Sequence, residues 1–164
     1  MFNSVHEFVN FWIKSGRPIS PPFENPVFTT DIAYSLVLFR KDNCQVELYT
    51  CKPNTQAPWH GHPNVDSFFI YLGGNIDFGK SDGTFAQTAH LQQAKEDGSH
   101  VLLGQTAEAL DGARHTLKVG AEGGAFLSFE KWNDKIPTSV TINWEGDPVG
   151  EEHKFSLTKG LDNG

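Results

Sequence analysis

Residues 58–66 read Pro-Trp-His-Gly-His-Pro-Asn-Val-Asp, and the apolar run FFIYL follows at residues 68–72. In an extended strand successive side chains alternate between the two faces, so His60 and His62 are predicted to point the same way, with Asp66 sharing their parity. Imidazole and carboxylate groups are common ligands of divalent metals. The stretch therefore predicts three potential metal ligands at the mouth of an apolar inner face. That face would be formed by Phe68, Ile70 and Leu72.

The spacing of the apolar segments predicts an all-β fold. The chain has 16 glycines and nine prolines, and these fall between short apolar runs, as is typical of strands joined by tight turns. The predicted strands are residues 33–40, 45–51, 65–72, 75–79, 100–103, 115–119, 125–132 and 139–145. Hairpin turns are expected at residues 41–43, 73–74 and 120–124. Eight such strands in 164 residues imply one domain, residues 1–164, built as a jelly-roll sandwich or barrel.

One amphipathic helix is predicted over residues 4–15, packed on the outside of a barrel that spans residues 33–145. Ser4 and Glu7 have the spacing of a capping box, and apolar residues recur after them at helical intervals. Gly16 is expected to end the helix. Residues 17–30 would form an extended connector, and residues 147–164 a charged tail on the surface.

The charge of the chain excludes some classes of partner. With 13 basic and 20 acidic residues the formal net charge is −7, which argues against binding to nucleic acid. No apolar run approaches the roughly 18 residues of a membrane-spanning helix, and the first residues lack the basic and apolar regions of a signal peptide. We therefore expect a cytoplasmic protein without a membrane partner. Cys44 and Cys51 would face opposite sides of one strand and stay unbridged.

Two segments are similar to the two sequence motifs of the cupin superfamily. Residues 54–73 follow the spacing of the first motif, G-x5-H-x-H-x3–4-E-x6-G, and residues 104–119 follow that of the second, G-x5-P-x-G-x2-H-x3-N. Two matching spacings are far more specific than a single H-x-H pair. The chain departs from the motifs at Asn54, Asp66, Leu110 and Val119.

The resemblance implies a cupin-like jelly-roll β-barrel, the double-stranded β-helix, with a divalent metal inside its mouth. The implied ligands are His60, His62 and His115, with Asp66 as the fourth. Iron(II) is the preferred metal, and zinc, manganese or nickel are alternatives. Because aspartate is one methylene shorter than glutamate, Asp66 would bind the metal directly, bind it through water, or orient a ligand histidine. The strand after His115 supports this set, since Leu117 and Val119 share its face.

Cupin-like proteins include dioxygenases, isomerases, lyases and ligand-binding modules, and the fold does not choose among them. The preferred expectation is a metal-dependent, dioxygenase-like oxidoreductase acting on a small oxygen-containing organic substrate. The alternatives are an isomerase or lyase, a non-catalytic small-ligand-binding module, and a barrel whose histidines bind no metal. Tyr71 and Glu108 are the candidate catalytic residues, with Glu130 as another possible base. A homodimer, formed through the outer strands or through Phe11 and Trp12 of the helix, is a further expectation.

Overall fold

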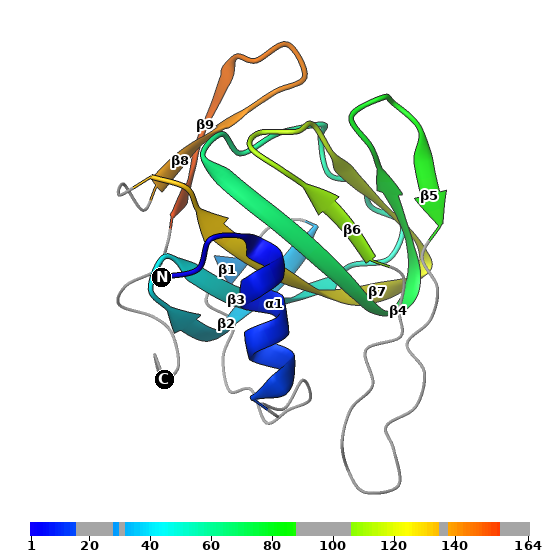
Figure 1. Cartoon of the computed structure of the whole chain (residues 1–164). Helices are drawn as coiled ribbons and strands as arrows, with labels where there is room; N and C mark the ends of the chain where they lie inside the picture. The colour runs from blue at the N-terminus through cyan, green and yellow to red at the C-terminus, as the bar shows by residue number, and fades with distance from the viewer. Residues whose placement is uncertain (16–27, 30–31, 88–105, 135–137, 155–164) are drawn as a thin grey trace, which may run out of the picture.

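The computed structural model describes residues 1–15, 28–29, 32–87, 106–134 and 138–154 (Figure 1). The elements in this part of the chain are α1 (Val5–Lys14), β1 (Phe28–Thr29), β2 (Ala33–Lys41), β3 (Cys44–Cys51), β4 (Val65–Gly79), β5 (Phe85–Gln87), β6 (Thr106–Ala109), β7 (Thr116–Trp132), β8 (Thr138–Ile142) and β9 (Pro148–Lys154). Gly16, most of the connector 17–30 and the predicted strand 100–103 lie outside the described residues. No helix among those described is both long enough and apolar enough to cross a membrane.

The helix predicted for residues 4–15 is confirmed to within one residue at each end. The Ser4 hydroxyl accepts the backbone N–H of Glu7 at 3.1 Å, while the Glu7 carboxylate accepts the N–H of Asn3 at 3.0 Å. The first bond satisfies an N–H group that the first helical turn leaves without an intrahelical partner, and the second ties the residue before the N-cap to the helix. Figure 1 shows α1 lying against the sheet that contains β4 and β7. Its buried side chains, Val5, Phe8, Val9 and Trp12, join one hydrophobic cluster with residues of that sheet.

The strands pair antiparallel throughout the described residues. They run in the order β1-β2-β3-β7-β4-β5, with β6 also paired to β4, and β8 and β9 form a separate two-stranded sheet. The hairpin turn predicted at residues 41–43 is confirmed, because it joins β2 to β3. The surface tail predicted from residue 147 begins with a strand that the sequence did not indicate, since β9 pairs with β8, and residues 147–149 are exposed. A three-residue strand such as β5 carries too few alternating residues to be recognised from sequence.

The predictions of hairpin turns at residues 73–74 and 120–124 are wrong. These residues lie inside β4 and β7, which remain paired on both sides of two register shifts. Gly74 has φ +86°, and a Cβ there would overlap the backbone of Gly123 and Gly124. The glycines therefore allow two backbones to approach closely while both strands bend, and the chain does not reverse. Each long strand consequently contributes to two walls of the barrel.

The two faces of the main sheet carry two separate clusters. Phe68, Ile70 and Leu72 belong to the cluster that α1 covers, whereas Phe69 and Tyr71 belong to the cluster inside the barrel. The predicted inner face of β4 is therefore wrong by one residue. The cause is the turn between the histidines and the strand, where the Val65 N–H donates to the His62 carbonyl at 3.1 Å and Asn64 has φ +73°. A turn interrupts the alternation of side chains, so parity does not carry across it.

The cysteines behave as the sequence predicts. Both are free thiols, Cys44 in the cluster under α1 and Cys51 in the cluster inside the barrel. Burial raises the pKa of each thiol to about 12. Because the thiolate is the reactive form, neither side chain is activated as a nucleophile.

Substitution of Phe129 by alanine tests the contact between α1 and the sheet. Phe129 is fully buried, and its ring contacts Trp12 and Phe8 at centroid distances of 5.4 and 6.1 Å. Phe129→Ala should lower the free energy of unfolding by about 3–5 kcal/mol in urea denaturation. Ile13→Ala is the control, because Ile13 is on the exposed side of the same helix and should cost no more than about 0.5 kcal/mol. Equal losses would mean that α1 does not pack as described.

Candidate metal centre

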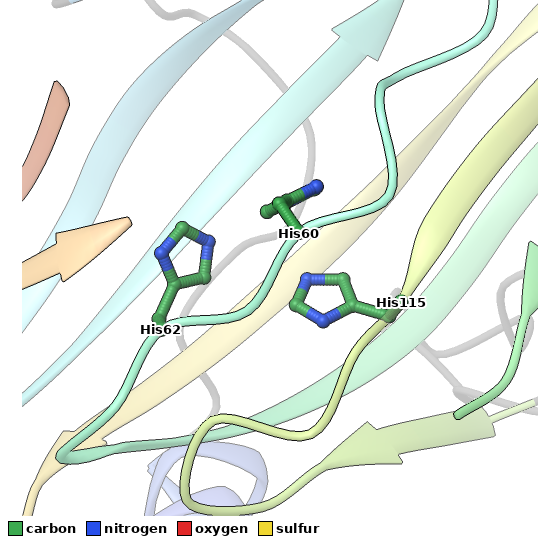
Figure 2. Close-up of side chains that lie close together, drawn as sticks. All are labelled: His60, His62 and His115. Carbon is green, nitrogen blue, oxygen red and sulfur yellow. The ribbon is translucent and has the colours of Figure 1, made fainter. Parts of the chain in front are cut away.

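Three histidines from two distant segments converge in the barrel. One ring nitrogen from each of His60, His62 and His115 lies within 4.8 Å of the other two. The ring centroids are 4.4 Å apart for His60 and His115, 5.0 Å for His60 and His62, and 5.6 Å for His62 and His115. Figure 2 shows His60 and His62 on one stretch of backbone and His115 on a neighbouring one, with the three rings close together. The structure thus brings together the three histidines that the motif spacing selects.

Backbone hydrogen bonds set this convergence. The His60 N–H donates to the His115 carbonyl at 3.1 Å, and the His115 N–H donates to the His60 carbonyl at 2.8 Å. Residues directly opposite in an antiparallel pair present their side chains on the same face. Further bonds extend the pairing, from Ala57 to Leu117 at 3.0 Å and from Val119 to Thr55 at 2.8 Å. The segment that carries the H-x-H pair is therefore fixed in register against the start of β7.

Gly61 permits a close approach between this segment and the loop before His115. A Cβ at position 61 would overlap the carbonyl oxygen of Gly112 and lie 3.3 Å from Cδ of Arg114. On its other edge, Gly61 exchanges two backbone hydrogen bonds with Ile142, at 2.9 and 3.0 Å. The residue between the two histidines is thus enclosed on both sides, and the site lies between β7 and β8.

The hydrogen bonds of the rings determine which nitrogen can bind a metal. Nδ1 of His60 lies 2.6 Å from the Pro58 carbonyl, and Nδ1 of His115 lies 2.9 Å from the Ala113 carbonyl. A carbonyl oxygen only accepts, so both Nδ1 atoms carry the proton and the lone pair is on Nε2. Nδ1 of His62 lies 3.3 Å from the hydroxyl of Thr141 in β8. When neutral, His60 and His115 held in this way would present Nε2 to a divalent transition metal.

The surroundings of the rings are apolar on the inner side. His115 is buried, whereas His60 and His62 are half-buried. The Phe78 ring stacks on His115 at 6.1 Å with an interplanar angle of 17°, and Phe69 contacts His115 at 5.8 Å. The donor atoms therefore lie at the border between the aromatic interior and the surface.

Asp66 lies outside the histidine group. Its position in β4 gives it the parity of Phe68, on the outer face, and its carboxylate accepts the backbone N–H of Asp111 at 2.9 Å. Asp111 in turn accepts the N–H of Asn64 at 3.2 Å. These bonds tie the turn after His62 to the loop before His115. The assignment of Asp66 as a direct ligand stays a prediction, and the geometry instead gives it contacts that position both ligand-bearing loops.

The two candidate catalytic residues lie in different places. Tyr71 is buried inside the barrel, where Phe78 contacts both its ring, at 6.4 Å, and His115. Glu108 is on the outer side of β6, exposed, and paired with His6 at 2.7 Å. Its neighbours Ala107 and Ala109 face the inner cluster, so Glu108 points away from it. The catalytic role of either residue stays a prediction, and the placement of Glu108 does not support one.

Some residues of the site could not be selected from sequence. Thr141, next to His62, belongs to an ordinary polar–apolar alternation in β8 and carries no motif. Pro58 and Ala113 take part only through their carbonyl oxygens, which any residue would supply. Gly61 is a partial exception, because a glycine between two histidines indicates a close backbone approach.

Alanine at position 61 tests that close approach. In Gly61→Ala the new methyl group should displace the loop that carries His115, because its nearest neighbour is a backbone oxygen that cannot move alone. We expect the affinity for zinc to fall by about tenfold or more in a competition titration with a chromophoric chelator. The control is Gly83→Ala, whose Cβ meets nothing within 4 Å although φ is +86°. It should lose about 1 kcal/mol of stability and keep its zinc affinity. Unchanged affinity in Gly61→Ala would contradict the described packing.

Comparison of the sequence with known protein families and with curated proteins finds no match. Solved structures do match. KdgF from Halomonas sp. has a TM-score of 0.53 at 7% identity, over 68% of this chain and 89% of that one. The DMSP lyase DddQ from Ruegeria pomeroyi DSS-3 has a TM-score of 0.53 at 11% identity, over 88% and 68%. A cupin domain of an XRE family transcriptional regulator from Enterobacter cloacae has a TM-score of 0.47 at 12% identity, over 62% and 98%. The jelly-roll β-barrel predicted from the sequence is confirmed at the level of the fold, which the chain shares with KdgF and with the DMSP lyase DddQ.

Proposed function

We propose that the protein is a metal-dependent enzyme that binds a small organic substrate through oxygen at a divalent ion held by His60, His62 and His115. The observation that carries this proposal is the convergence of three ring nitrogens within 4.8 Å of one another. The hydrogen bonds at Nδ1 support it, because they leave the lone pair of His60 and of His115 on Nε2.

The donor set indicates the chemistry. Three neutral imidazoles leave the double charge of the ion uncompensated and leave coordination positions open, so the ion would polarise a substrate oxygen or, as iron(II), support oxidation by dioxygen. We give first place to the iron(II), dioxygenase-like oxidation of a small oxygen-containing substrate. A lyase or isomerase reaction that uses the ion only as a Lewis acid is the second candidate. It is favoured by the absence of a carboxylate from the described histidine group.

The residues around the histidines would assist in defined ways. Burial holds the pKa of Tyr71 well above its usual range, so its phenol stays protonated at neutral pH and would donate a hydrogen bond to a substrate without releasing its proton. Phe69 and Phe78 would exclude water from the inner side of the ion. Asp66, through Asp111, would hold the two ligand-bearing loops in place.

Metal content is the direct test of the three ligands. Protein purified without a metal-affinity tag should contain about one divalent ion per chain by elemental analysis. His60→Ala and His115→Ala should each lose it, because two imidazoles bind a divalent ion far more weakly than three. His6→Ala is the matched control, since His6 is exposed on the outer face and paired with Glu108. Full metal retention in both ligand variants would refute the assignment.

Oxygen consumption distinguishes the two candidate reactions. The iron(II)-loaded protein should consume dioxygen with a keto-acid, thiol or aromatic substrate, and the zinc-loaded protein should not, because zinc has no redox chemistry. Turnover supported equally by both metals, without oxygen uptake, would instead establish the Lewis-acid reaction. If neither form turns over any substrate while a ligand still raises Tm, the protein is a binding module and the enzymatic proposal is wrong.

A further inference from the structure

A second group of polar side chains lies inside the barrel. On β3 and β7 the residues that continue the inner parity of Tyr49 and Phe126 are polar, and on β4 the polar Ser67 shares a face with Phe69. We call them the inner polar wall: Gln45, Glu47, Ser67, Ser128 and Glu130. The register places Gln45 and Ser67 on either side of Glu130, and Glu47 and Phe69 on either side of Ser128. All five side chains are between 0 and 7% exposed.

Hydrogen bonds connect this wall internally. The Gln45 amide donates through Nε2 to Glu47 at 2.5 Å and to Glu130 at 3.0 Å. The Ser128 hydroxyl donates to the other oxygen of Glu130 at 3.1 Å. The Tyr49 hydroxyl donates to Glu47, and burial, followed by the charges of Glu47 and Glu130, raises the pKa of Tyr49. Every donor in these bonds is directed at a carboxylate, so the wall as a whole presents acceptors.

Two polar atoms in this region lack a partner. The Gln45 side-chain oxygen is buried and has no hydrogen-bond partner among the described residues, and the same holds for the Tyr71 hydroxyl. Each side chain is at most 2% exposed. A buried polar group without a partner costs about 1–3 kcal/mol. The Gln45 oxygen belongs to the amide that lies between the two carboxylates, so an unsatisfied acceptor sits at the centre of the wall.

A purely structural role does not account for this composition. Two buried carboxylates are expensive to desolvate, and an apolar interior of similar volume would be at least as stable. Arg40 lies opposite Gln45 in the register and is buried, so a guanidinium adjoins the same group. The Gln45 oxygen is the acceptor of the wall that has no partner among the described residues. A ligand group that brings hydrogen-bond donors, such as a hydroxyl or an ammonium, would complement it.

The wall and the histidines share one interior surface. Phe69 is the cross-strand neighbour of Ser128, and its ring contacts His115 at 5.8 Å. We propose that the inner polar wall binds the hydrogen-bond-donating end of a small bifunctional ligand whose oxygen-bearing end binds the ion held by His60, His62 and His115. This inference rests on the proposed function and assigns its substrate class. The substrate has a carboxylate or carbonyl oxygen at one end and a hydroxyl or ammonium group at the other.

Matched probes can test the inference without knowledge of the natural substrate. The zinc-loaded protein is titrated calorimetrically with unbranched carboxylates of two to six carbons in three forms: unsubstituted, with a terminal hydroxyl, and with a terminal ammonium. At one or more lengths the hydroxyl or ammonium form should bind about tenfold or more tightly than the unsubstituted form, since a hydrogen bond to a charged group contributes about that much. The advantage should disappear in Glu130→Gln and persist in Glu122→Gln, which changes an exposed glutamate of the same strand.

Each outcome decides between the alternatives. Equal affinities for all three forms, an advantage that survives in Glu130→Gln, or zinc-loaded protein that binds none of the probes would overturn the role of the wall and leave the metal site intact. Protein that fails to retain zinc by elemental analysis would overturn the proposed function, and this inference with it. If Glu130→Gln does not fold, Glu47→Gln serves instead. It replaces the other carboxylate of the wall by an amide of the same size and should reduce the advantage by about threefold or more.

Discussion

The reciprocal backbone hydrogen bonds between His60 and His115 are the constraint on which the site depends. They join a segment outside the named strands to the beginning of β7, and this register presents three imidazoles to one space. Carbonyl groups next to His60 and His115 and the Thr141 hydroxyl next to His62 then orient the individual rings. A shift of one residue in this pairing would turn His115 to the other face. The backbone pairing therefore determines where the three proposed ligands lie.

The strand patterns of this chain invert the usual relation between polarity and exposure. On β3 the apolar positions Cys44 and Val46 face outward, where α1 covers them, and the polar positions Gln45 and Glu47 face inward. An amphipathic strand does not indicate which of its faces meets water when a helix covers one of them. The helix thus does more than add hydrophobic contacts. By covering the apolar face it leaves the polar face for the interior, where it can bind a ligand.

Features with a local signal could be predicted from the sequence, and features that depend on which strands pair could not. The helix, the hairpin between β2 and β3 and the three histidines were predictable, because capping, turn and motif signals are local or have fixed spacing. The prediction of a hairpin turn at Gly73 and Gly74 is wrong because a glycine pair fits a bent strand as well as a turn. Only the partner strand, whose own glycines approach at the same point, decides between them. The inward direction of Glu130 likewise follows from register, which composition does not contain.

The position of β8 has a consequence for how the site responds to its surroundings. Ile142 pairs with Gly61 and Thr141 contacts the ring of His62, yet β8 belongs to a two-stranded sheet separate from the main one. With an ion held by the three histidines, as proposed, attachment of this hairpin and occupancy of the site would be linked equilibria. Whatever factor of affinity the attached hairpin adds for the ion, the bound ion must add equally for attachment. A molecule that binds β8 or β9 and weakens the pairing of Ile142 with Gly61 would therefore lower the affinity for the ion without touching it.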